Sequence, residues 1–127
     1  MKKVSLIVPC YNEEEALPIF AAELDRVRQG LGQYEFEVLM VNDGSSDDTL
    51  KVMKDVSSKY KYFKYLSFSR NFGKESAMYA GFCNASGDYV AVMDADMQDP
   101  PSLLPKMLEI LEQGEYDSVA TRRVTRK

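Results

Sequence analysis

The densest group of chemistry-capable side chains lies in VMDADMQDPP, at residues 92–101. Asp94 and Asp96 are two positions apart, so in an extended backbone their side chains share one face with Gln98. Carboxylate and amide oxygens without histidine or cysteine suit a hard divalent cation, Mg²⁺ or Mn²⁺. Two like charges this close require a cation between them or a raised pKa. The small Ala95 between them lets another group approach the backbone.

The same segment also has an interpretation without a metal, as an acidic loop before a helix. Pro101 is favoured at a helix start, and Asp99 can accept hydrogen bonds from the first N–H groups of that helix. We assign Asp99 to the helix cap and the Asp94–Asp96 pair to a metal site.

Two earlier loops carry residues that could hold a nucleotide. Asp43 begins the turn in VNDGSSDDT, at residues 41–49, where it could accept hydrogen bonds from a ribose or a base. The segment could equally be an ordinary turn with Gly44 at a positive φ. Tyr11 could pack against a nucleobase or cover the edge of the sheet, and Glu13 could favour the first turn of its helix.

Basic residues gather in two places. Arg70 and Lys74, in SRNFGKES, could neutralise phosphates, or they could belong to a solvated surface. Arg122 and Arg123 could face a metal–diphosphate site, or they could be exposed near the chain end.

Composition excludes several classes of protein. The net charge of −4 disfavours nucleic acid and anionic membranes as general partners. Histidine is absent, which removes histidine-based triads and most zinc sites. Cys10 and Cys83 lie far apart and lack any metal-ligand spacing. So few cysteines indicate a reduced cytosolic compartment, and Cys10 is interpreted as a core residue. No apolar segment approaches the roughly 18 residues of a membrane span, so the chain as given is expected to be soluble.

Short apolar runs alternate with segments of helical periodicity, which favours one α/β domain with a largely parallel sheet. Strands are expected at 4–8, 36–41, 62–68, 89–93 and from 116 to 120, and helices at 13–31, 46–60, 73–85 and 101–113. The basic tail, 121–127, is expected to add no further element. Ligands of such sheets bind beyond the carboxyl ends of the strands, so the loops described above should converge there.

Five segments together resemble family-2 glycosyltransferases of the GT-A fold, and among these the polyprenyl-phosphate sugar transferases. They are IVPCYNEE at 7–14, VNDGSSDDT at 41–49, SRNFGKESAMYAG at 69–81, DADMQDPP at 94–101 and ATRR at 120–123. They occur in the family's order and roughly its spacing, across nearly the whole chain.

The resemblance implies a role for each matching residue. Pro9, Tyr11 and Glu13 match a loop that contacts the nucleotide. Val41 and Asp43 match positions that hold the base and ribose. Asp94, Ala95 and Asp96 match the motif that meets the nucleotide-sugar, and Asp94 and Asp96 are the predicted catalytic residues. Asp96 and Gln98 match the side that holds Mg²⁺ or Mn²⁺, and Arg122 matches an arginine near the diphosphate.

The resemblance also implies a fold and an activity. The fold is GT-A, a mixed, mainly parallel sheet flanked by helices and truncated at its C-terminal side, with 1–127 as the nucleotide-sugar-binding half. The activity is transfer of a sugar, with inversion, from a UDP- or GDP-linked donor to a polyprenyl phosphate. The full-length form would act at the cytoplasmic face of a membrane. Uncovered helix faces could promote a homo-oligomer.

Three other functions stay open from the sequence. The chain could be a non-catalytic nucleotide-sugar-binding module, or a transferase acting on a saccharide hydroxyl, which needs a general base. A phospho-receiver domain would share the length, the α/β alternation and the acidic site. However, the first strand ends in Pro9-Cys10-Tyr11 instead of an acidic pair, and the fifth leads to arginines instead of a lone lysine.

Overall fold

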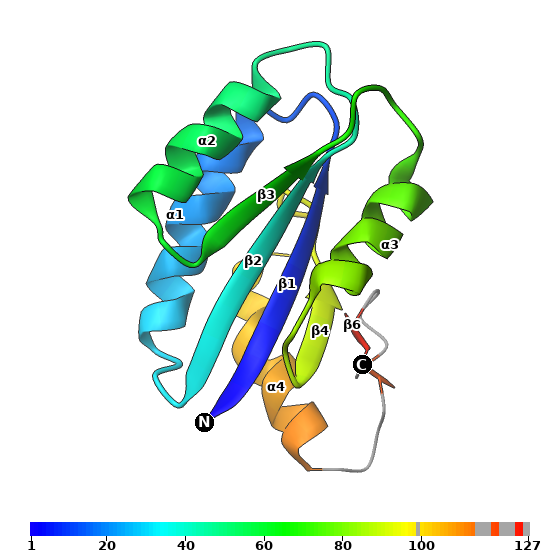
Figure 1. The fold of residues 1–127 in the computed structure, drawn as a ribbon. Helices are drawn as coiled ribbons and strands as arrows, with labels where there is room; N and C mark the ends of the chain where they lie inside the picture. The colour runs from blue at the N-terminus through cyan, green and yellow to red at the C-terminus, as the bar shows by residue number, and fades with distance from the viewer. Residues whose placement is uncertain (99, 114–117, 120–123, 126–127) are drawn as a thin grey trace.

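The computed structural model describes residues 1–98, 100–113, 118–119 and 124–125. These residues form a sheet with the strand order β3-β2-β1-β4-β6-β5 (Figure 1). The strands are β1 (Lys2–Cys10), β2 (Tyr34–Asn42), β3 (Phe63–Ser67), β4 (Tyr89–Val92), β5 (Ser118–Val119) and β6 (Val124–Thr125). The first four are parallel, whereas β6 is antiparallel to β4 and β5. The predicted mixed, mainly parallel α/β fold is confirmed.

Helices cover both faces of the sheet (Figure 1). They are α1 (Ala16–Gln29), α2 (Thr49–Lys59), α3 (Lys74–Asn84) and α4 (Leu104–Glu112), and a short 3-10 helix (Pro101–Leu103) precedes α4. Helices α1, α2 and α4 pack on one face, and α3 packs on the other. The chain moves outward from β1 through β2 to β3, and then returns across the opposite face, through α3, to β4.

The two faces of the sheet bury unequal cores. Alternate residues of β1 point to opposite sides, so Leu6 and Val8 join α1, whereas Ile7 faces α3. The larger core includes Phe20 of α1, which is fully buried. On the smaller side α3 lies close to the sheet, because a Cβ at Gly81 would be 2.4 Å from Ile7 Cγ2.

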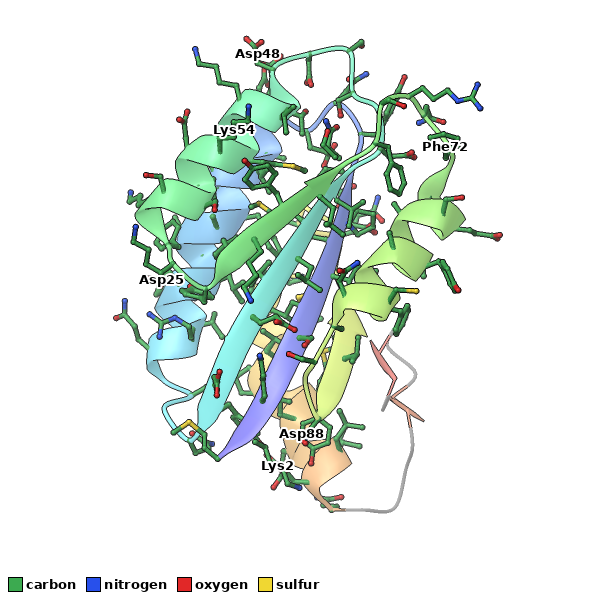
Figure 2. The ribbon with its side chains drawn as sticks, in the orientation of Figure 1. Lys2, Asp25, Asp48, Lys54, Phe72 and Asp88 are labelled. Carbon is green, nitrogen blue, oxygen red and sulfur yellow. The ribbon has the colours of Figure 1, made fainter. Side chains whose placement is uncertain are left out.

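A buried carboxylate joins strands at the amino end of the sheet, which Lys2 and Asp88 mark in Figure 2. Glu37 is 4% exposed and accepts hydrogen bonds from Ser5 Oγ at 2.7 Å and from the Ser86 N–H at 2.9 Å. The ammonium groups of Lys3 and Lys64 lie 3.4 and 3.6 Å from Glu37 Oε2. Donors and positive charge thus compensate for the burial of this charge.

Two expectations from the sequence are wrong. The tail was expected to add no element, but β6 lies between β4 and β5; a two-residue strand is too short to show a hydrophobic period. The backbone after β4 was expected to stay extended, but β4 ends at Val92 and residues 95–98 form turns and bends. Asp96 Oδ1 accepts the Gln98 N–H at 3.1 Å, and such local bonds by Asp compete with strand geometry.

The described helices include none with the length and apolar character needed to cross a bilayer.

Candidate active site

A pocket of about 250 Å³ lies at the carboxyl ends of the parallel strands, the end marked by Asp48 and Phe72 in Figure 2. The last residues of β1, the loops after β1, β2 and β4, and the first residue of α3 supply its lining. The lining residues are Pro9, Cys10, Tyr11, Glu13, Asp43, Lys74, Asp94, Asp96 and Gln98. The chain reverses its direction across the sheet between β1 and β4, the kind of position where open α/β sheets bind ligands.

Most of the predicted site residues therefore meet in one pocket. Asp94, Asp96 and Gln98 line it together although the backbone between them turns, and Met97 has a positive φ of 69°. Val41 and Ala95 are buried beside the pocket without lining it. Arg122 and Asp99 lie outside the described residues. The place of Arg122 near a diphosphate and the role of Asp99 as a helix cap therefore stay predictions.

The pocket is strongly acidic on one side. Burial raises the pKa of Glu13 above its ordinary value, and the charges of Asp96 and Asp94 raise it further. Lys74 opposes this shift. Its Nζ donates to Asp94 Oδ1 at 2.8 Å, and the Asp94 side chain is only 13% exposed. Lys74 therefore lies at the acidic side of the pocket and pairs with Asp94, while 45% of its own side chain stays exposed.

Asp43 uses its carboxylate within the protein. It is 4% exposed, and its Oδ1 accepts the Phe72 N–H at 2.8 Å. Its Oδ2 accepts the Gly73 N–H at 3.1 Å and Asn71 Nδ2 at 3.2 Å. Asp43 thus fixes the loop between β3 and α3 while it lines the pocket, a function that the sequence did not reveal.

The neighbouring turn is held in the same way. Asn12, at φ 55°, accepts the Ser46 N–H at 2.8 Å on its Oδ1. Its own N–H donates to Ser45 Oγ at 2.9 Å. Gly44 has the expected positive φ of 66°, and a Cβ there would lie 2.1 Å from the Arg70 carbonyl carbon. Asn12 and Gly44 therefore hold together the loops that follow β1, β2 and β3.

Tyr11 and Cys10 are neighbours with different environments. Tyr11 is 50% exposed at the pocket, which leaves much of its ring accessible to a flat ligand. Cys10 is 1% exposed and belongs to the main core. Burial, together with the charges of Glu13 and Asp94, raises the pKa of the Cys10 thiol. A thiol that stays protonated is a poor nucleophile, in agreement with its interpretation as a core residue.

The pocket also contains the residues predicted to bind a divalent cation. Within the described part of the chain, no three His, Cys, Asp or Glu side chains gather into a metal site. Asp96 and Gln98 nevertheless offer one carboxylate and one amide oxygen at the same pocket. Mg²⁺ and similar ions bind through one or two carboxylates and take their other ligands from water and phosphate. The residues present fit that mode of binding.

The family model of glycosyl transferase family 2 matches residues 5–127. The chain belongs to this family, as the five motifs predicted.

Two curated relatives are similar over almost the entire chain. A bactoprenol glucosyl transferase of Shigella phage SfV is 43% identical over 124 residues, which are 98% of this chain and 40% of the relative. An undecaprenyl-phosphate 4-deoxy-4-formamido-L-arabinose transferase of Photorhabdus laumondii is 38% identical over 128 residues, 100% of this chain and 39% of the relative. The chain thus spans about 40% of the length of these relatives.

Solved structures share the fold. A mannosyltransferase, PcManGT from Pyrobaculum calidifontis, in complex with GDP-Man and Mn²⁺, superposes with a TM-score of 0.75 at 21% identity, covering 87% of this chain and 32% of that one. S. aureus TarS in complex with UDP gives a TM-score of 0.66 at 26% identity, covering 98% of this chain and 38% of that one. These similarities confirm the GT-A fold predicted from the motifs.

Proposed function

We propose that residues 1–127 form the nucleotide-sugar-binding part of an enzyme that transfers a sugar, with inversion, to a polyprenyl phosphate. One observation carries this proposal: most of the residues that the motifs assign to donor binding line a single pocket, among them Tyr11, Asp43, Asp94 and Asp96. The names of the two relatives, which are glycosyl transferases of bactoprenol and of undecaprenyl phosphate, support the acceptor class. The ligands of two solved neighbours, GDP-Man and UDP, support the donor class.

In this proposal the two sides of the pocket have different tasks. Tyr11 packs against the base, and Pro9 and Glu13 complete that side, while Val41 and Asp43 shape the base and ribose site from beneath. Asp96 and Gln98 would hold Mg²⁺ or Mn²⁺, and the Mn²⁺ in one neighbour supports this assignment. A bound cation would offset the negative charge that grows on the diphosphate as the glycosidic bond breaks.

The acceptor decides how much further chemistry the protein must supply. A polyprenyl phosphate already carries an anionic oxygen, so it can displace the diphosphate directly without a strong general base. A saccharide hydroxyl would need a base to remove its proton. Asp94 stands beside the reacting end of the donor in either case, and Arg122 is assigned to the diphosphate. A lipid acceptor would place the enzyme at the cytoplasmic face of a membrane.

The test is a binding screen of UDP- and GDP-sugars by calorimetry, with and without Mn²⁺. We expect the 127-residue chain to bind one of them, and Mn²⁺ to strengthen that binding. Asp96→Ala should weaken the binding of that nucleotide-sugar in the presence of Mn²⁺ by at least about tenfold, because a cation ligand is lost. Asp55→Ala, an exposed aspartate on α2, is the matched control and should change nothing.

Metal-dependent binding that survives Asp96→Ala unchanged would contradict the assigned site. The 127 residues span about 40% of these relatives, so they could bind a nucleotide-sugar and yet be inactive alone. Binding without hydrolysis or transfer to an added polyprenyl phosphate in a protein of the relatives' full length would instead favour a non-catalytic nucleotide-sugar-binding module.

A further inference from the structure

Lys74 is placed at the acidic side of the pocket by the fold itself. It is the first residue of α3, directly after Gly73, whose N–H donates to Asp43. Gly73 has a φ of 103°, a value that other residues rarely adopt. The anchored loop and this glycine together determine where α3 begins, and hence where the lysine side chain starts.

The contact that Lys74 makes is well suited to a change of partner. Its Nζ lies 2.8 Å from Asp94 Oδ1, yet 45% of the lysine side chain is exposed. Lysine is a compact charge on a flexible stem, so its Nζ can move several ångströms without any backbone change. Among the described residues that line the pocket, Lys74 is the one basic side chain.

We propose that Lys74 is an exchangeable counter-charge: it neutralises Asp94 when no metal is bound, competes with a divalent cation there, and turns to the diphosphate of a bound nucleotide. This inference rests on the proposed function. Without a positive charge nearby, Asp94 and Asp96 would repel each other. A cation that binds together with a nucleotide would neutralise them in place of Lys74. The released ammonium then lies next to a new anion, the diphosphate, in the same pocket.

The inference predicts effects of opposite sign on two ligands. Lys74→Met should tighten binding of Mn²⁺ alone about threefold to tenfold, because a competing charge is removed from a partly buried pair. The same variant should weaken binding of UDP or GDP without metal by a similar factor. Lys54→Met removes the same charge from α2 (Figure 2), away from the pocket, and should alter neither affinity.

A second pair of variants separates position from charge. Gly73→Ala should also change the Mn²⁺ affinity, because alanine is strained at this φ and disturbs the start of α3, from which the Lys74 side chain extends to Asp94. Gly32→Ala is matched to it: neither glycine has an atom within 4 Å of an added Cβ, but Gly32 lacks the positive φ. Gly32→Ala should leave the affinity for Mn²⁺ as it is.

Mn²⁺ affinity is read from the electron paramagnetic resonance of the unbound ion, and thermal unfolding checks that each variant is folded. An unchanged or weaker Mn²⁺ affinity in folded Lys74→Met overturns the inference, even where the unaltered chain binds a nucleotide-sugar with metal. If neither the unaltered chain nor folded Lys74→Met binds any nucleotide-sugar with metal, the proposed function is overturned too.

Discussion

Two carboxylates, Glu37 and Asp43, are almost fully buried, and several donors satisfy each of them. Glu37 lies within β2, whereas Asp43 directly follows the last residue of that strand, and the two serve different purposes. Asp43 fixes a loop of the pocket, whereas Glu37 joins β1, β2 and the segment before β4. A buried charge of this kind is tolerated because its hydrogen bonds replace those of water.

Glu37 predicts how stability depends on pH. Burial alone would raise the pKa of Glu37, but the Ser5 hydroxyl, the Ser86 N–H and the charge of Lys3 outweigh it and lower the pKa to about 2. A folded-state pKa below the ordinary 4.5 means that the carboxylate stabilises the fold above that pH. This stabilisation should be lost as the pH falls from 4.5 towards 2.

Glu37→Gln should lower the free energy of unfolding at pH 7 by about 1–3 kcal/mol, because the charged acceptor is lost. It should also flatten the pH dependence below 4.5. Urea unfolding at pH 7 and pH 3 measures both effects. Glu35→Gln, on the same strand but with a 60% exposed side chain, is the control; an equal loss in both variants would contradict the role of Glu37.

Sequence could predict which residues line the pocket but not every task they perform. Tyr11, Asp43 and Asp94 follow separate strands, and parallel strands bring their carboxyl ends to one edge, so convergence follows from the order of elements. The hydrogen bonds that Asp43 accepts from residues 71–73 depend on how β2 and β3 align. That register is a tertiary property, and no local pattern in the sequence reports it.

At the level of elements, α3 is the one described helix that packs on its face of the sheet, whereas α1, α2 and α4 pack on the other. Its contact with β1 is close at Gly81, where a Cβ would lie 2.4 Å from Ile7 Cγ2 and 2.9 Å from Ile7 Cγ1. The sequence predicted this helix at 73–85 through its small and apolar residues. It did not predict the face that α3 covers, which follows from the return of the chain to β4.

Gly81→Ala should therefore destabilise the protein by about 1–3 kcal/mol, since Ile7 is fully buried and has little room to yield. Gly30→Ala is the control. An added Cβ there would be 3.6 Å from the Val27 carbonyl oxygen, an ordinary contact, and φ is −86°. Thermal unfolding compares the two variants. A neutral or stabilising effect of Gly81→Ala would show that α3 is packed less closely than described.

The whole molecule holds two thiols in contrasting places: Cys10 is buried beneath the pocket, and Cys83 is exposed on α3. Their separation means that they report different events. Modification of Cys10 requires the core or the pocket floor to open, whereas Cys83 meets reagents in the folded state.

A thiol reagent should consequently modify Cys83 rapidly and Cys10 slowly at pH 8. In a Cys83→Ser variant, the remaining thiol should react at least about a hundredfold more slowly than Cys83 does in a Cys10→Ser variant, because a stable core opens rarely. The absorbance of the thiolate that the reagent releases gives the reaction rates of both variants. Similar rates for the two variants would refute the described burial of Cys10.

The hydrogen bonds made by Asn12 and Asp43 also bear on how quickly a ligand can bind. These bonds order the loops around the pocket as the chain folds, so little conformational entropy remains to be lost when a ligand arrives. The proposed exchange by Lys74 requires only a side-chain rotation, which takes picoseconds to nanoseconds at an exposed residue. The rate of ligand association should then be limited by collision and orientation and not by rearrangement of the backbone.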